Sequence, residues 1–133
     1  MIVVDTNVIG YLLLSSDQSL LAEQALQKDI EWAAPVLWRS EFRNVLTLYM
    51  RKDIINLEQA QAIMNSALKL LKGREYQVPS TEVLRFASES KCSAYDCEFI
   101  AVAIDLKVPL VTVDKQMLRE FPSVAVSLST FSK

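Results

Sequence analysis

Histidine is missing from this sequence of 133 residues, which narrows the chemistry that the protein can perform. Without histidine there is no Ser-His-Asp or Cys-His triad, no imidazole general base, and no zinc or iron site that needs an imidazole ligand. Any catalysis must therefore come from carboxylates, hydroxyl groups, Lys, Arg or backbone groups.

Cysteine is almost as scarce, since Cys92 and Cys97 are the only two. Two thiols without histidine cannot complete a tetrahedral zinc site, so we interpret both as reduced, ordinary residues. No apolar run is long enough to span a bilayer, and Asp5 interrupts the apolar N-terminal segment too early for a secretory signal. We therefore expect a cytoplasmic protein with no membrane segment.

Glycine and proline are also few, with 2 and 4 residues, whereas 51% of the chain is hydrophobic. Such a composition is typical of a compact globule and excludes a disordered or collagen-like chain. The length is that of one domain, which we place at residues 1–133. The formal net charge is only −2, so no strongly cationic composition indicates a nucleic-acid partner.

Short strands alternate with amphipathic helices along the sequence. Apolar and β-branched runs predict strands at 2–4, 31–34, 75–78, 109–113 and 124–127. Helical periodicity predicts helices at 7–14, 18–28, 35–51, 57–71, 80–90 and 94–106, with Pro35 and Pro79 where helices begin. Strands separated by helices need crossover connections, so we expect an α/β fold of three layers with a mainly parallel central sheet.

Two acidic residues follow predicted strands directly. Asp5 comes after the strand at 2–4, and Asp114 after the strand at 109–113. In open α/β sheets the ligand site lies outside the carboxyl ends of the strands, which makes both acids candidate site residues. Each also has a simpler interpretation, because Asp between a strand and a helix is a preferred N-cap.

Glu41 lies in the apolar stripe of its predicted helix. At about 100° per residue it projects between Val45 and Leu48. The whole stripe consists of Trp38, Phe42, Val45, Leu48 and Tyr49. A carboxylate is rarely placed in such a stripe without a partner, because its desolvation costs several kcal/mol by general experience.

Asp96 repeats this pattern in the helix at 94–106. It projects between Ile100 and Ala103, whereas Glu98 and Asp105 are expected on the opposite face. The alternative is a capping box, with Ser93 as the N-cap and Asp96 three residues later.

Taken together, these four acids could converge on one concave rim. Two carboxylates 4 Å apart repel by about 4 kcal/mol at an effective dielectric constant near 20, so such a cluster needs cations. Oxygen ligands alone select hard divalent ions such as Mg²⁺ or Mn²⁺. These ions activate water and stabilise phosphate oxygens during phosphodiester hydrolysis, which requires no histidine.

Three segments together with Glu41 resemble the PIN-domain ribonucleases and, more narrowly, the VapC-type toxins of prokaryotic toxin-antitoxin pairs. The segments are MIVVDTNV at 1–8, SAYDCEFIAVA at 93–103 and PLVTVDK at 109–115. The resemblance covers essentially the whole chain, with the landmarks in family order and at family spacing.

The resemblance implies that Asp5, Glu41, Asp96 and Asp114 hold Mg²⁺ or Mn²⁺ as a catalytic quartet. Thr112 would orient a water or a ligating oxygen, and Asn7 would support Asp5. Some relatives carry a further acid three residues after the last one, where this chain has Met117, so fewer oxygens remain for a second metal ion.

The resemblance also implies a PIN-like fold with a parallel sheet of about five strands in the order 3-2-1-4-5. The implied function is that of an endoribonuclease toxin, inhibited by a cognate VapB-type antitoxin and assembled as a homodimer. The mean hydropathy of +0.20 agrees with apolar surface covered by a partner. Expected contacts to the RNA substrate come from surface cations, namely Arg39, Arg43, Lys115 and Arg119.

Two other functions remain open at this stage. A haloacid-dehalogenase-like phosphohydrolase would use Asp5 as a nucleophile, but it needs a second Asp where this chain has Asn7. A catalytically inactive PIN-fold binding module would act through protein or RNA contacts alone. A phosphorelay receiver domain fits less well, because the strand at 75–78 is followed by Pro79 and not by a phosphoacceptor Asp.

Overall fold

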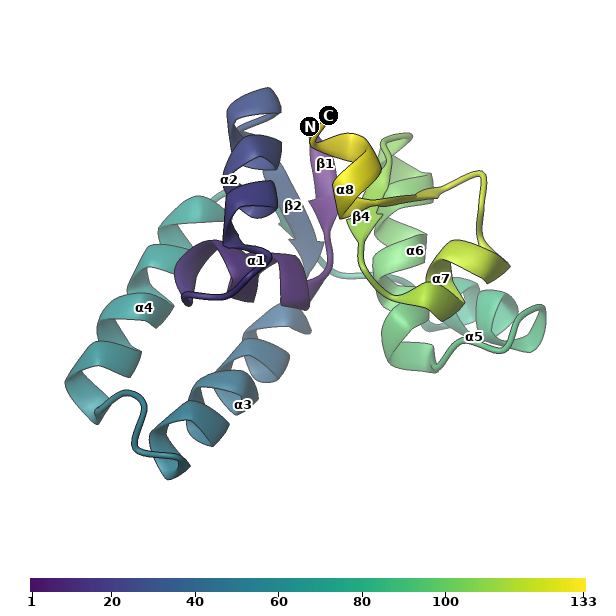
Figure 1. Ribbon diagram of the computed structural model, residues 1–133. Helices are drawn as coiled ribbons and strands as arrows, with labels where there is room; N and C mark the ends of the chain where they lie inside the picture. Colours follow the sequence, from purple (N-terminus) through teal and green to yellow (C-terminus); the bar gives the residue numbers. More distant parts are fainter.

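One parallel sheet of five strands forms the centre of the structure, a computed structural model that describes all 133 residues (Figure 1). Its strands lie in the order β3-β2-β1-β4-β5. Their bounds are β1 (Ile2–Val4), β2 (Trp32–Pro35), β3 (Glu75–Tyr76), β4 (Leu110–Thr112) and β5 (Ala125–Ser127). The expected α/β class and the expected strand order 3-2-1-4-5 are both confirmed.

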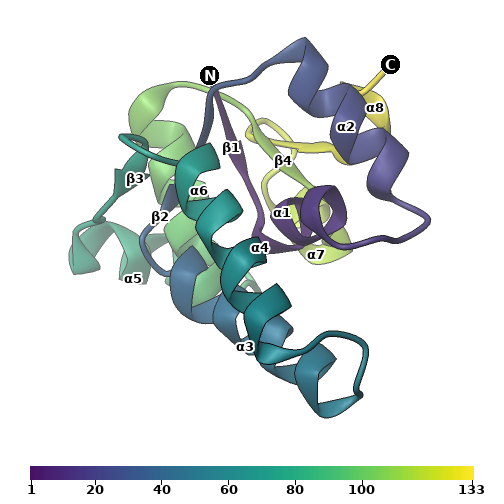
Figure 2. The same cartoon turned by 90° about the vertical axis from the view of Figure 1, so that its left-hand side faces the viewer.

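Helices cover both faces of this sheet. Helix α6 packs on β1, β2 and β4, while α1 and α8 contact β4, and the turned view shows α6 and α1 on opposite sides of the central strands (Figure 2). The eight helices are α1 (Thr6–Leu13), α2 (Ser19–Lys28), α3 (Trp38–Arg51), α4 (Leu57–Leu70), α5 (Ser80–Ser88), α6 (Ala94–Leu106), α7 (Lys115–Glu120) and α8 (Leu128–Phe131). None of them is both long and apolar enough to cross a bilayer.

The start of α3 differs from its prediction. Pro35 ends β2 instead of beginning the helix, and its partner in the neighbouring strand is Tyr76. The next amide, that of Val36, donates to the Tyr76 carbonyl (2.9 Å), so sheet pairing extends past the proline. Proline is tolerated at the end of a strand, which explains why the same residue can stand at either kind of boundary.

The short helices α7 and α8 were not predicted. Asp114 caps α7 by accepting a hydrogen bond from the Met117 N–H (2.9 Å), and Ser127 caps α8 by accepting one from the Thr130 N–H (3.1 Å). Helices of one or two turns carry too little periodicity to be recognised from the sequence, so the caps are the only local signal.

Helices α3 and α4 form a hairpin that extends beyond the sheet (Figure 1). Trp38, Phe42 and Leu46 of α3 are buried, whereas Leu48, which the sequence placed on the core stripe, is 47% exposed. The far part of α3 lies past the edge of the sheet, so the apolar stripe continues where there is little core to receive it.

A hydrogen-bonded ion pair attaches the start of α3 to β3. Glu75 accepts hydrogen bonds from Trp38 Nε1 (2.7 Å) and from Nε and Nη2 of Arg39 (both 2.6 Å). The Arg39 guanidinium holds the pKa of the Glu75 carboxyl below its ordinary value, despite an opposing effect of burial. Arg39, which the sequence suggests as an RNA contact, thus also helps to position α3 through this ion pair.

We predict that Glu75→Ala lowers the free energy of unfolding by about 2 kcal/mol at pH 7, because it leaves the Trp38 and Arg39 donors without their charged acceptor. The depressed pKa of Glu75 means that its contribution is present above the ordinary carboxyl pKa and is lost as the pH falls. Urea denaturation at several pH values measures this effect. Glu23→Ala, at an exposed position of α2, is the control, and an equal loss in both variants would contradict the assignment.

Candidate active site

The centre of the candidate site lies where β1 and β4 end side by side. The Asp5 N–H donates to the Val111 carbonyl (3.1 Å), which continues the sheet pairing as far as Asp5. The Thr112 hydroxyl donates to Asp5 Oδ2 (2.8 Å), and the two residues are 0% and 8% exposed. A carboxylate at this depth keeps its position because a buried hydroxyl holds one oxygen.

Asp114 is connected to the same hydroxyl. Its backbone N–H donates to Thr112 Oγ1 (3.0 Å). The Thr112 hydroxyl therefore accepts one hydrogen bond, from Asp114, and donates another, to Asp5. The Asp114 side chain meanwhile caps α7, as the N-cap interpretation expected. Asp5 occupies the N-cap position of α1 but makes no capping hydrogen bond with its side chain.

Glu41 reaches the site from the first turn of α3. Its Oε1 accepts a hydrogen bond from the Thr6 hydroxyl (2.7 Å), and Thr6 is only 5% exposed. Glu41 is predicted for this region from the sequence, whereas Thr6 is not. The available signal was a hydroxyl residue directly after Asp5, which the start of α1 turns toward α3.

Asp96 approaches from the first turn of α6. Ser93 caps this helix by accepting a hydrogen bond from the Asp96 N–H (3.1 Å), so the capping interpretation is correct for the backbone. The Asp96 side chain is half-buried, and its pKa is raised by burial and by the charge of Asp114. A capping role and a place in the cluster are therefore compatible.

The electrostatics show that these carboxyl groups lie near one another. Burial, together with the charges of Glu41 and Asp96, raises the pKa of Asp5 to about 6, although the Thr112 hydrogen bond opposes the change. Burial and the charge of Asp96 likewise raise the pKa of Glu41. The structure therefore brings together the four acids that the sequence singled out, in a region that disfavours their charged forms.

Glu98 adds a fifth carboxylate that the sequence analysis placed on the opposite face of α6. Burial and the charge of Glu41 raise its pKa, so Glu98 lies close enough to Glu41 to respond to it. Helix α6 is buried over most of its surface and has no clean polar side. A helical projection therefore could not separate inward from outward carboxylates in this helix.

No basic side chain neutralises this cluster. The ion pairs of the structure join the N-terminal amine to Asp29 and Glu31, and Arg39 to Glu75. Asn7, expected to support Asp5, is exposed and makes no hydrogen bond to it, so Thr112 takes that role. The carboxylates are thus oriented by hydroxyls and backbone amides, which leave their negative charge in place.

The donor set fits a hard divalent cation in chemistry and in charge, because it offers only oxygen atoms and lacks a compensating base. In their present positions, however, no three of these side chains surround a common point. Ion binding would therefore require some of these side chains to change position.

Comparisons with known proteins show which proteins this chain resembles. The chain is 25% identical over 126 residues to a protein named Ribonuclease VapC3 from Pyrobaculum aerophilum, covering 92% of this chain and 96% of that protein. The crystal structure of PAE2754 from the same organism matches with a TM-score of 0.73 at 22% identity, over 98% of this chain and 92% of that chain.

FitAcB from Neisseria gonorrhoeae matches with a TM-score of 0.74 at 20% identity, over 97% of this chain and 99% of that chain. These two structural matches establish the shared fold. The family model of the PIN domain matches residues 2–123, which include all four acids of the cluster. The chain therefore belongs to the PIN domain family.

Proposed function

We propose that this protein is an endoribonuclease that hydrolyses RNA phosphodiester bonds with Mg²⁺ or Mn²⁺ held by Asp5, Glu41, Asp96 and Asp114. The observation that carries the proposal is a group of buried and half-buried carboxylates, gathered at the carboxyl end of the sheet without a basic partner. The ribonuclease named among its relatives supports RNA as the substrate.

A divalent ion bound at this position would activate water and stabilise negative charge on the phosphate oxygens. The chain's own residues prepare the site for it. Thr112 fixes Asp5 through Oδ2 and leaves Oδ1 available, and Thr6 holds Glu41 through Oε1 and leaves Oε2 available. Either Glu41 or Asp114 would steer the attacking water, while Asp5 and Asp96 would be the principal ligands of the ion.

A nucleophilic role for Asp5, as in a haloacid-dehalogenase-like enzyme, has less support from the geometry. The carboxyl is 8% exposed, and Thr112 already binds one of its oxygens. Asn7 stands where that chemistry needs a second acid, and it makes no hydrogen bond to Asp5. We therefore assign Asp5 to ion binding.

The biological role that we propose is that of a toxin in a VapBC-type pair, acting in the cytoplasm as a homodimer and inhibited by a VapB-type antitoxin. The motif resemblance and the relative named VapC3 support this role. Exposed apolar side chains agree with partner contacts, among them Leu20, Ile30, Ile54, Leu57 and Leu84, which are 59% to 70% exposed.

We predict that the purified protein cleaves single-stranded RNA internally in Mg²⁺ or Mn²⁺ and that Asp96→Asn lowers kcat at least about 100-fold, because a neutral amide binds the cation poorly. Electrophoresis of end-labelled RNA measures the cleavage. Asp105→Asn, at an exposed position of the same helix, is the control. Induced expression of wild type should arrest growth, and equally strong arrest by Asp96→Asn would contradict metal-dependent hydrolysis as the mechanism.

Thr112→Val should lower activity by about 10- to 100-fold, as expected for loss of the partner that orients a metal-binding side chain. Thr112→Ser should retain most of the activity, since it keeps the hydroxyl that bonds Asp5. Single-turnover cleavage rates at saturating Mn²⁺, together with Mn²⁺ titrations, compare the two variants. Similar rates for Val and Ser at this position would show that the hydroxyl has no such function.

The metal-free protein should lose stability as the pH rises from 3.8 toward 6. The folded carboxyl of Asp5 has a pKa raised to about 6, so its favourable contribution exists below the ordinary pKa and disappears through the folded one. At pH 7.5 without metal, Asp5→Asn should therefore be about 2 kcal/mol more stable than wild type.

Adding Mg²⁺ should raise the melting temperature of wild type and have little effect on Asp5→Asn, because the ion compensates the charge that the variant lacks. Thermal unfolding with and without EDTA measures both effects, and Asp105→Asn serves as the matched control. If Mg²⁺ stabilises wild type and Asp5→Asn equally, Asp5 does not bind the ion.

A further inference from the structure

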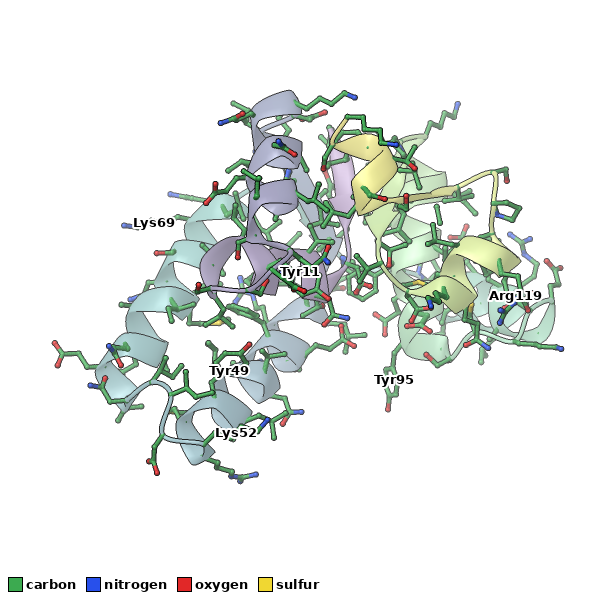
Figure 3. All side chains as sticks on the ribbon, viewed as in Figure 1. Tyr11, Tyr49, Lys52, Lys69, Tyr95 and Arg119 are labelled. Carbon is green, nitrogen blue, oxygen red and sulfur yellow. The ribbon has the colours of Figure 1, made fainter.

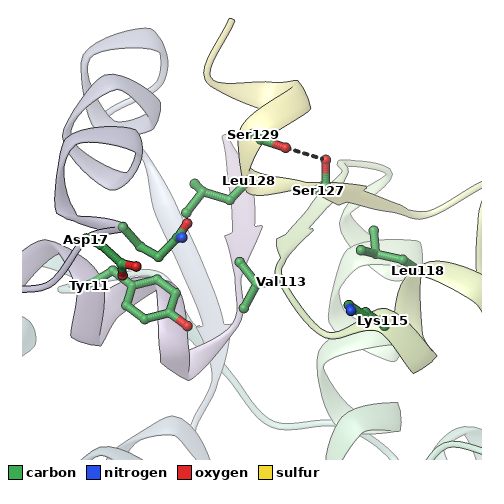
Figure 4. A pocket seen from close by; sticks show the side chains of 9 residues that line it. Tyr11, Asp17, Val113, Lys115, Leu118, Ser127, Leu128 and Ser129 are labelled. Carbon is green, nitrogen blue, oxygen red and sulfur yellow. Dashed lines mark hydrogen bonds between the residues drawn. The ribbon is translucent and has the colours of Figure 1, made fainter.

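Two hollows adjoin the acidic cluster, and Tyr11 of α1 lines both of them. The larger has a volume of about 510 Å³ and lies between Tyr11 and the segment that carries Val113 and Lys115 (Figure 4). The smaller has a volume of about 230 Å³ and lies toward Tyr49 of α3. A cavity of about 150 Å³ accommodates a benzene ring, so each hollow is large enough for an aromatic base.

Both hollows are lined by residues that neighbour the candidate active site. Val113, in the wall of the larger one, stands between Thr112 and Asp114. Thr6, in the wall of the smaller one, donates the hydrogen bond that holds Glu41. Asp5 lies close enough to contribute to the raised pKa of Tyr11, after the effect of burial. Both hollows are therefore lined by residues that lie next to the carboxylates in the chain or hold one of them.

Tyr11 is free to bind a ligand. Its side chain is only partly buried, and its hydroxyl makes no hydrogen bond within the protein. The Ser19 hydroxyl donates instead to the Tyr11 backbone carbonyl (2.7 Å), which fixes this end of α1 against the start of α2. Figure 3 shows Tyr11 in the middle of the molecule, between α1 and the strands, and Tyr49 on α3. The backbone of Tyr11 is thus held in place, while its hydroxyl group has no hydrogen-bond partner within the protein.

The lining suits a single strand of RNA. Aromatic side chains bind unpaired bases by stacking, and bases are accessible in this way only where the strand is unpaired. Val113, Leu118 and Leu128 provide apolar surface in the larger hollow, facing Tyr11 across it in Figure 4. Lys115 is exposed at its edge and belongs to no ion pair, so it is available to a backbone phosphate.

We propose that Tyr11 separates two nucleobase subsites, which receive the bases on either side of the scissile phosphate of single-stranded RNA, and that Lys115 contacts the adjoining backbone. This inference rests on the proposed ribonuclease function and adds the form of the substrate and its mode of binding. Tyr11 stacks against a base on each face of its ring. It therefore acts in substrate binding and not in the chemical step.

Binding of two RNA strands by wild-type and variant Tyr11 proteins tests this role of Tyr11. In the cleavage-deficient Asp96→Asn background, fluorescence anisotropy measures binding of a single-stranded RNA octamer and of an abasic octamer with the same sugar-phosphate backbone. Tyr11→Leu should weaken binding of the RNA at least about fivefold, the lower end for loss of one stacked base, and should leave binding of the abasic strand unchanged. Tyr76→Leu, on β3, is the matched control and should change neither.

Equal losses on both strands, or no loss on either, would overturn the assignment of Tyr11.

A second measurement needs no variant at this position: RNA containing 4-thiouridine is irradiated with the protein, and the adducts are mapped by mass spectrometry. An adduct on Tyr11 supports the proposal, and adducts confined to other residues overturn it. Absence of any RNA cleavage by wild type would refute the ribonuclease function, whereas cleavage with a KM unchanged by Tyr11→Leu refutes only the subsites.

Discussion

The hydrogen bond from Thr112 to Asp5 is the interaction on which the rest of the site depends. It connects the ends of the two central strands, β1 and β4, and it holds a carboxylate in a position from which water is largely excluded. The same Thr112 hydroxyl accepts the Asp114 amide, so the turn that leads into α7 is tied to Asp5. One buried hydroxyl thereby joins Asp5 and the start of α7 at the end of the sheet.

This arrangement has an electrostatic cost at neutral pH, which a bound divalent cation would offset. Hydroxyl and amide donors stabilise a carboxylate, but they add no positive charge, and the basic side chains of the chain do not pair with the cluster. A site of this kind is less stable than a neutral core and better prepared for an ion. The raised pKa of Asp5 reflects this cost, because burial and the neighbouring carboxylates disfavour its charged form.

Much of the fold was predictable, because the strand and helix patterns of the sequence have clear periods. Helix α6 was predicted with both ends correct, since Ser93 supplies an N-cap and the apolar residues repeat with helical spacing. The predictions failed where tertiary contacts decide the local structure. Pro35 belongs to a strand because it pairs with Tyr76, and Leu48 is exposed because the hairpin of α3 and α4 extends past the sheet.

The candidate site was predictable as a set of acids but not as a set of contacts. Asp5 and Asp114 follow from strand ends, and Glu41 and Asp96 from their places in apolar stripes. Apart from Thr112, which the resemblance assigned to orienting a water or a ligating oxygen, the partners could not be predicted, because which hydroxyl faces which carboxylate depends on how α1, α3 and β4 meet. Thr6 and Glu98 were missed for that reason, Asn7 was assigned a contact that Thr112 makes, and the ion pair of Arg39 with Glu75 was not predicted.

The proposed function requires these carboxylates to hold a divalent cation at the end of β1. Anomalous diffraction from crystals soaked in Mn²⁺ tests it most directly, because the scattering locates the ion without reference to activity. We expect a peak within oxygen-ligand distance, about 2.0 to 2.2 Å, of carboxylate oxygens of Asp5 and Asp96. A peak bound only elsewhere on the surface, or no peak beside Asp5 at saturating Mn²⁺, would contradict it.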